Sequence, residues 1–279
     1  MMPSAARNTL LLAVDLEEFY RDDGAPAGTA SPLATLVDPL LETFAARRVS
    51  ATFFTVGDVA RSHGDLVRKI SAAGHEIACH GDRHLPLTRL DPATCAADLR
   101  RNMDAISALG LPRPVGFRAP LLSLGAHQQW AFPVLRGLGF TYSSSVLPAR
   151  TPLHDWPEFG NEPRVCDGVL EIPVTVAKLG ALRVPCFCGT YYRVLPDFLA
   201  RRLIRTAAAR RPVCGYLHPY DFDQRQPWTW HAELQGRLFY NHLLFVRRGS
   251  LLQRVRGLLA DEDWEVLTYR EFARRRAFA

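Results

Sequence analysis

The sequence predicts an α/β fold, a distorted (β/α) barrel with about seven parallel strands in a single domain. Apolar runs of strand length alternate with segments of helical spacing along most of the chain. The longest early run, residues 9–16 (TLLLAVDL), is typical of a strand that is buried on both faces. Polar residues follow several of these runs, where the carboxyl ends of parallel strands would meet.

The first half of the chain alternates regularly between the two kinds of segment. After the first strand, residues 21–31 are rich in Gly, Ala, Pro and Asp and predict a loop. Helices are predicted at 32–48, 58–73, 91–109 and 126–138. Pro92 in a first helical turn and Gly74 after a last one are typical boundary residues. Strands are predicted at 51–56, 75–79, 115–118 and 140–146.

The second half is less regular. Residues 147–168 hold prolines at positions 148, 152, 157 and 163 and predict a long loop, which in a compact domain is usually functional. Strands at 170–176, 213–217 and 264–268 and helices at 196–211, 233–246, 250–260 and 269–278 complete the pattern. With no internal repeat or linker, we expect one catalytic domain over 1–279. Its motif-bearing core spans about 9–220, and 221–279 complete the fold.

Composition and charge limit the classes of function. The chain has 279 residues, of which 48% are hydrophobic and 22% charged, as in soluble globular proteins. The net charge is +6, but the arginine pairs are dispersed and form no stripe with stacking aromatics. We therefore predict no nucleic-acid partner, whose binding would weaken steeply with salt. The charge is compatible with an anionic substrate or with peripheral contact to a membrane surface.

The sequence gives no sign of secretion or of a membrane span. Residues 1–8 hold one arginine and no long apolar core, and no run of about 20 apolar residues follows. The six cysteines include no C-x-x-C pair. We therefore expect no transmembrane segment and a cytoplasmic protein with reduced thiols.

Two histidines four residues apart, His80 and His84, follow the third predicted strand. Imidazole nitrogens are common ligands of zinc-class ions, and this spacing lets two rings converge on one ion if the backbone turns helically. In a chain with nine histidines the pair is weak evidence by itself. Its weight depends on the residues that end the other strands.

Further polar residues fall on the same predicted rim. Acidic residues follow the first strand, and Arg118 and His218 end later ones. Each has a plain structural explanation, since a strand-end Asp often caps a turn and a single histidine is often half-buried packing. Their coincidence favours a metal site of two histidines and one carboxylate. A second carboxylate as base, a protonated histidine as acid and an arginine beside the base would complete a metal-assisted amide or ester hydrolase.

Four motifs occur in order: VDLE at 14–17, HGDRH at 80–84, FRAP at 117–120 and YLHP at 216–219. Together with ATFF at 51–54 and GHEI at 74–77, they resemble the polysaccharide deacetylases, the carbohydrate esterases that share the chitooligosaccharide-deacetylase homology domain. The resemblance covers ordered pieces from about residue 10 to 220. Each motif is short, and the specificity lies in their order and spacing.

The resemblance implies a role for each matching residue. Asp15 would be the general base, Arg118 would orient it, and His218 would be the general acid. The metal ligands would be Glu17, His80 and His84. The ion would be one divalent metal, Zn²⁺ in the first place, with Co²⁺ or Mn²⁺ as alternatives. The backbone N–H of Leu121, after the Arg-Ala-Pro turn, would help to form the oxyanion hole.

The sequence departs from the family pattern in two places. Glu17 stands where the family usually has Asp, and its longer side chain keeps Glu18 open as a rival ligand. The family's fourth motif, an Asp with a groove-lining Trp, has no clean match. We take Asp155 and Trp156 as a substitute, although a loop Asp and a packed indole explain the pair equally well. Tyr191, in a predicted turn at 189–192, is a further candidate for binding a sugar ring.

The predicted function is removal of an N-acyl group, N-acetyl in the first place, from an amino sugar. The substrate would be a glycan or glycolipid precursor of a surface polysaccharide, free or lipid-linked. One alternative is a deformylase or another hydrolase of linear C–N amide bonds that uses the same site. An alternative of another class is a non-catalytic carbohydrate-binding homologue. The presence of all six candidate groups argues against it.

Overall fold

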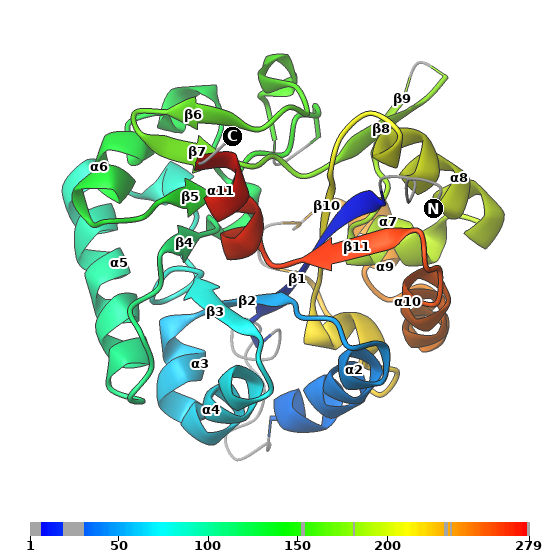
Figure 1. Ribbon diagram of the computed structural model, residues 1–279, viewed down its shortest axis with the longest axis horizontal. Helices are drawn as coiled ribbons and strands as arrows, with labels where there is room; N and C mark the ends of the chain where they lie inside the picture. Colours follow the sequence, from blue (N-terminus) through cyan, green and yellow to red (C-terminus); the bar gives the residue numbers. More distant parts are fainter. Residues whose placement is uncertain are drawn as a thin grey trace, which may run out of the picture.

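A computed structural model of the chain describes residues 7–18, 31–151, 154–180, 182–231, 234 and 236–277. Its centre is a curled sheet of nine strands (Figure 1). The strands are β1 (Asn8–Leu16), β2 (Thr52–Thr55), β3 (Glu76–Cys79), β4 (Gly116–Phe117), β5 (Tyr142–Ser143), β6 (Arg164–Cys166), β7 (Val169–Glu171), β10 (Val213–Leu217) and β11 (Trp264–Leu267).

The strand order is β10-β1-β2-β3-β4-β5-β7-β6, and β11 also pairs with β1. Every pair is parallel except β6 with β7. The prediction of a distorted (β/α) barrel in a single domain is thereby confirmed. Strand β1 pairs with β2 from the first half of the sequence and with β10 and β11 from the second half. Both halves of the sequence therefore form one sheet.

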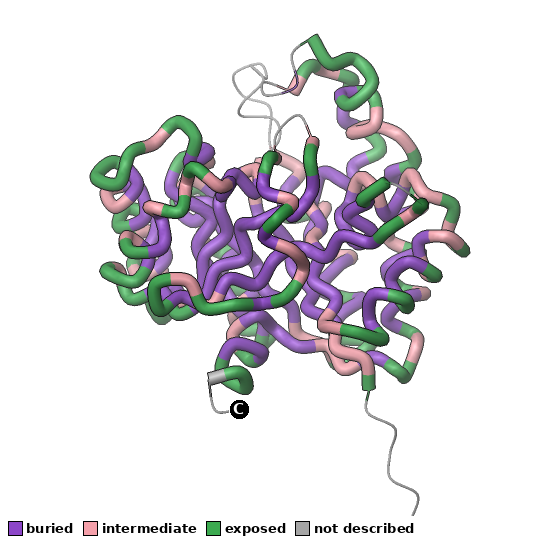
Figure 2. Tube along the Cα trace, turned by 90° about the horizontal axis from the view of Figure 1, so that it is seen from above, coloured by how far each residue is buried: buried purple, intermediate pink, exposed green. Residues whose placement is uncertain are grey.

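Helices surround the sheet, so that most of its strands are buried and the outer faces of the helices are exposed, whereas the edge strand β6 is largely exposed (Figure 2). The helices are α2 (Leu33–Arg47), α3 (Gly57–Ser62), α4 (Gly64–Ala72), α5 (Pro92–Ser107), α6 (Ala131–Gly137), α7 (Gly189–Val194), α8 (Asp197–Ala208), α9 (Leu238–Leu243), α10 (Leu251–Leu259) and α11 (Tyr269–Ala277). None of the helices in the described part of the chain is both long and apolar enough to cross a membrane.

Side-chain alternation along β1 separates two cores. Leu10, Leu12 and Val14 pack against the surrounding helices in the larger hydrophobic cluster. Leu11 and Ala13 point to the opposite face and belong to a separate cluster inside the curled sheet. Since successive side chains of a strand point to opposite faces, the next residue on the inner face is Asp15. The alternation that builds the core thus also aims a carboxylate into the barrel.

Helix α11 fills the end of the barrel at which the strands begin. Tyr269 packs edge-on against Phe54, with ring centroids 5.5 Å apart, and stacks on Tyr142. Its backbone N–H donates to the Thr52 hydroxyl at the start of β2 (2.9 Å). The N–H of Arg270 donates to the Glu76 carboxylate at the start of β3 (3.0 Å). The carboxyl ends of the strands therefore form the opposite end of the barrel.

Thr175 links the chain that leaves β7 to the far strand β10. Its backbone N–H donates to the carbonyl of Cys214 (2.8 Å), and its hydroxyl accepts from the N–H of Cys214 (2.8 Å). Thr175 is buried. Two reciprocal hydrogen bonds thus connect opposite sides of the curled sheet where no strand pairing does so.

Several predicted boundaries were wrong. The predicted helix 58–73 is two helices, α3 and α4, which meet at His63. The predicted strand 170–176 ends with β7, and an antiparallel hairpin of β8 (Val176–Leu179) and β9 (Leu182–Pro185) follows it. The predicted turn at 189–192 is the start of α7, whereas α9 is shorter than 233–246. Residues 19–30, Glu233 and Phe278 lie outside the described part.

Replacing Thr175 with valine tests the link between β7 and β10. The substitution keeps the shape but leaves the buried N–H of Cys214 without its acceptor, which costs about 1–3 kcal/mol of folding free energy. Urea unfolding of Thr175→Val measures this loss. Thr141→Val is the control, because the Thr141 hydroxyl is exposed; its change should stay within about 0.5 kcal/mol. Equal effects in both variants would contradict a structural role for Thr175.

Candidate active site

Asp15 lies at the end of β1, buried on the inner face of the sheet, and it meets Arg118 at the end of β4. A guanidinium N–H of Arg118 donates to Asp15 Oδ1 at 2.7 Å. The second oxygen, Oδ2, lies 4.0 Å from Nε2 of His80. One carboxylate oxygen is therefore fixed by the arginine, while the other faces the histidines.

Arg118 is fully buried, and its charge is compensated on every side. Besides Asp15, it donates to the carbonyl and the hydroxyl of Ser144 (both 3.0 Å) and to the Tyr269 hydroxyl (3.0 Å). The ring of Phe54 lies under the guanidinium, 4.2 Å from its central carbon. Burial lowers the pKa of Arg118, but the Asp15 charge raises it more, so the pKa lies above its usual value. The arginine is a permanent cation beside the carboxylate.

The two histidines lie on a loop after β3, and the helical turn expected between them is absent. Gly81 and His84 instead adopt left-handed backbone angles, with φ of 74° and 55°. Helix α5 holds this loop: Asn102 donates to the carbonyl of Gly81 (2.6 Å), and Asp98 accepts from the N–H of Asp82 (2.7 Å). Packing against α5, rather than local helicity, makes the two rings converge.

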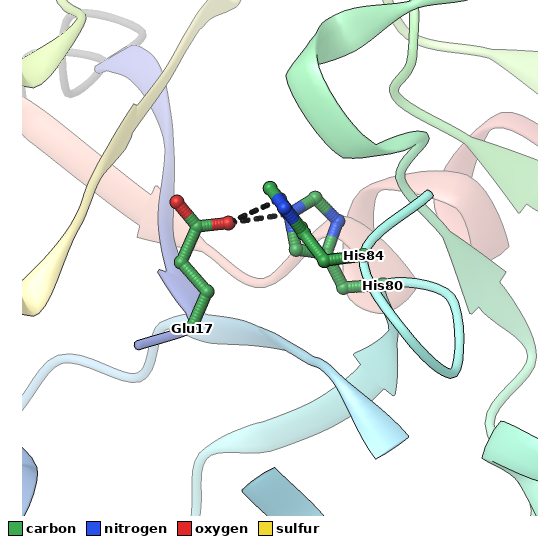
Figure 3. A group of neighbouring side chains, drawn as sticks. All are labelled: Glu17, His80 and His84. Carbon is green, nitrogen blue, oxygen red and sulfur yellow. Dashed lines mark ion pairs between the residues drawn. The ribbon is translucent and has the colours of Figure 1, made fainter. Parts of the chain in front are cut away.

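Glu17, His80 and His84 form the candidate metal site, with one ligand atom from each within 4.8 Å of the others. Figure 3 shows the carboxylate of Glu17 directed at both rings. Its Oε2 lies 2.5 Å from Nε2 of His84 and 3.3 Å from Nε2 of His80. Nδ1 of His80 donates to the carbonyl of Arg118 (2.9 Å), so Nε2 keeps its lone pair for an ion. Two imidazoles and a carboxylate fit a zinc-class ion.

The rival ligand Glu18 points elsewhere. Its carboxylate lies 3.1 Å from Nε2 of His63, at the junction of α3 and α4. For Glu17, burial raises the pKa, but the charge of His84 and hydrogen bonds with His80 and His84 lower it more, to well below the usual range. The geometry therefore favours Glu17, ionised, as the carboxylate partner of the histidines.

His218 follows β10 and approaches the same carboxylate from its other oxygen, with Nε2 3.7 Å from Glu17 Oε1. Its Nδ1 donates to Asp221 (3.0 Å), and Asp221 also accepts from Arg193 of α7 (3.3 Å). Burial lowers the pKa of His218, but the hydrogen bond and charge of Asp221, with Glu17 and Asp15, raise it above its usual value. The His218 ring is thus held as a proton donor at Nε2.

Asp221 was missed from the sequence, although its place three residues after His218 is a detectable signal. Burial raises the pKa of Asp221, but the hydrogen bond and charge of His218 and the charge of Arg193 lower it to about 2. Arg193 and Tyr269 were also missed. Their roles depend on contacts between elements distant in sequence, and no local pattern reveals them.

Leu121 has a left-handed backbone, with φ 57° and ψ 19°, which is unusual for a branched residue. His154, which the sequence did not single out, donates from Nε2 to the Leu121 carbonyl (3.0 Å), and its Nδ1 pairs with the Thr151 hydroxyl. Burial lowers the pKa of His154 to about 4, so the ring is neutral.

The remaining substrate-binding candidates lie in two different cavities. Tyr191 lines a cavity of about 140 Å³ that reaches His218. Asp155 is exposed and Trp156 is packed on Phe159, and both line a neighbouring cavity of about 320 Å³. None of the six candidate polar groups at the barrel end is among the described residues lining this second cavity. His154 lines both cavities and stands between them.

Two family models match successive parts of the chain. Residues 21–143 match the family model described as polysaccharide deacetylase. This stretch, less than half of the chain, is similar to the polysaccharide deacetylases. Residues 144–270 match a model described as a domain of unknown function (DUF3473). That second region supplies His218, Asp221 and Tyr269, and the first supplies His80, His84 and Arg118, so both matched regions contribute to the same site.

Curated relatives are similar to parts of the chain, and a solved structure shares its fold. A chitooligosaccharide deacetylase from Bradyrhizobium sp. is 33% identical over 116 residues, 38% of this chain and 53% of the relative. One from Rhizobium leguminosarum bv. trifolii is 37% identical over 67 residues, 24% of this chain and 31% of the relative. The chain thus spans about half or less of these relatives. A protein described as a polysaccharide deacetylase from Mycobacterium smegmatis shares the fold, with TM-score 0.66, 22% identity and coverage of 100% and 93%.

Replacing Arg118 with methionine leaves Asp15 buried without its partner and should cost about 3–5 kcal/mol of folding free energy. Neutralising the partner as well, in Asp15→Asn with Arg118→Met, should recover a large part of this loss. Urea unfolding of the wild type, both single variants and the double variant completes the cycle.

The exposed pair Arg68–Asp65 provides a matched control. Arg68→Met should change the folding free energy by less than about 1 kcal/mol, because water screens that pair. If Arg118→Met behaves like Arg68→Met, the buried ion pair does not organise the site.

Proposed function

We propose that this chain is a metal-dependent hydrolase that removes N-acetyl groups from an amino sugar of a surface-polysaccharide or glycolipid precursor. The observation that carries the proposal is the convergence of Glu17, after β1, with His80 and His84, after β3, beside an arginine-bound Asp15. The match of residues 21–143 to the polysaccharide deacetylase model supports a carbohydrate substrate. The N-acetyl group, the zinc-class ion and a cytoplasmic location are parts of the proposal.

Glu17, His80 and His84 would hold the divalent ion, which when bound activates water and polarises the acyl carbonyl as a Lewis acid. Asp15 accepts the proton of the attacking water at Oδ2, while Arg118 holds Oδ1. His218 donates a proton from Nε2 to the leaving nitrogen.

The positions of the two proton-transfer groups support these roles. The free oxygen of Asp15, Oδ2, faces His80, one of the two histidines that Glu17 contacts. His218 stands beside the other oxygen of Glu17. The N–H of Leu121 is proposed to stabilise the developing oxyanion. Tyr191 would contact the sugar beside His218, and Asp155 with Trp156 would bind a more distant part of the glycan.

Metal content tests the site directly. Elemental analysis of the wild type should find about one zinc-class ion per chain, and His80→Ala should lose it. Acetate release from N-acetylated sugar nucleotides or lipid-linked glycans should fall by more than about 100-fold in His80→Ala. The reason is that mutating even a residue that only hydrogen-bonds to a metal ligand lowers metal affinity or activity by about 10–100-fold.

His242→Ala is the matched control, because His242 is exposed and lines neither cavity; it should keep both metal and activity. A wild type that binds no zinc, cobalt or manganese would refute the metal-dependent hydrolase. A metal-loaded wild type that releases formate instead of acetate would favour the deformylase, and one that releases no acyl group would favour the carbohydrate-binding homologue.

The pH profile tests the acid. Asp221→Asn removes the main group that raises the pKa of His218, so that this pKa falls. Because the acid must be protonated, the alkaline limb of kcat/KM should move to lower pH. Asp223→Asn changes a carboxylate that binds the N–H of Arg225 instead, and its alkaline limb should stay in place. An unmoved limb in Asp221→Asn would remove His218 from the role of acid.

A further inference from the structure

Apolar side chains are concentrated on one exposed surface near the site. Five of the eight large hydrophobic residues that are exposed in the described part of the chain fall between 228 and 240. Singly exposed apolar residues are ordinary, whereas a cluster marks an interaction surface. We call this cluster the aromatic patch, and its members are Trp228, Trp230, Leu238, Phe239 and Tyr240.

The patch is one continuous surface rather than two neighbouring segments. Buried Asn241 of α9 accepts from the N–H of His231 (2.7 Å) and donates to the carbonyl of Thr229 (2.8 Å). These bonds fix the loop that carries the two tryptophans against the helix that carries the other three residues. The rings of Trp228 and Trp230 lie 5.1 Å apart. The side chains therefore present a fixed apolar face.

The stretch of chain that carries this face is basic. Arg225, Arg237 and Arg247 are exposed within it, and the described residues from 224 to 250 include no acidic side chain. The sequence of this stretch holds a single acid, Glu233. Tryptophan, tyrosine and phenylalanine suit the level of lipid headgroups, and arginines attract anionic lipids. This composition is that of a surface that lies on a membrane.

The patch adjoins the candidate active site. Tyr240, together with Leu243 and Leu244, lines the cavity of about 140 Å³ that also contains His218. Arg193 of α7 connects the two, because it donates to the carbonyls of Leu243 (3.0 Å) and Leu244 (2.7 Å) as well as to Asp221. Figure 1 shows α7 and α9 in the same part of the molecule.

We propose that the aromatic patch docks on an anionic membrane surface. Docking places the cavity at His218 next to that surface, where glycans carried by membrane lipids would reach it. The choice of such glycans as substrates rests on the proposed function, whereas the docking does not. A lipid surface matches the patch because its acyl chains can bury the apolar side chains while its anionic headgroups attract the arginines.

Vesicle sedimentation with the full chain tests the docking. The wild type should bind vesicles of phosphatidylglycerol and phosphatidylcholine, bind pure phosphatidylcholine more weakly, and detach as salt rises. Each of Arg225, Arg237 and Arg247, when changed to glutamine, should weaken partitioning by about fivefold. Leu238→Ser with Phe239→Ser should weaken it at least about tenfold.

Phe198→Ser is the matched control, because Phe198 is 75% exposed but lies on α8, outside the patch. It should bind vesicles like the wild type. His80→Ala, which should abolish hydrolysis, should also bind like the wild type, so that loss of hydrolysis and loss of docking are separate results.

Two outcomes would overturn the proposal. One is equal vesicle binding by the wild type and the Leu238→Ser, Phe239→Ser variant. The other is a wild type that ignores vesicles and forms a dimer that this variant abolishes in light scattering, since the patch would then cover a second copy of the chain.

Discussion

The buried charge of Arg118 is the constraint on which the site depends. A guanidinium with no access to water must be paired and fully hydrogen-bonded, or it destabilises the fold. Its partners come from β1, from the chain at the end of β5 and from α11. Satisfying one side chain therefore fixes the relative positions of elements from the whole length of the sequence, and with them the carboxylate of Asp15.

Much of the fold could be predicted because its signals are local. The apolar runs of β1, β2, β3 and β10 end in polar residues, and parallel strands bring such ends together. That argument placed Asp15, His80 and His218 on one rim without any structure. The hairpin of β8 and β9 escaped prediction because its first strand continues the apolar run of β7, although Pro173 within that run is typical of a strand boundary.

The parts of the site that escaped prediction depend on tertiary contacts. His80 and His84 converge through a loop held by Asn102, not through the helical turn that their spacing suggested. Arg193 and Tyr269 act through hydrogen bonds to residues far away in the sequence. Trp156, in contrast, packs on Phe159. This contact agrees with the alternative that the sequence left open, a tryptophan packed within its loop. Spacing predicts which residues can meet, whereas packing decides how they do so.

The position of β1 has a consequence for how the chain is made. This strand is synthesised long before β10 and β11, yet it pairs with both of them in the finished sheet. During synthesis, β1 therefore has unpaired backbone N–H and C=O groups until β10 and β11 have left the ribosome. Unpaired strand edges of this kind can pair with other chains. The matched deacetylase segment alone, residues 21–143, also lacks the strand that bears Asp15. Vectorial synthesis thus makes the active site one of the last features of the molecule to form.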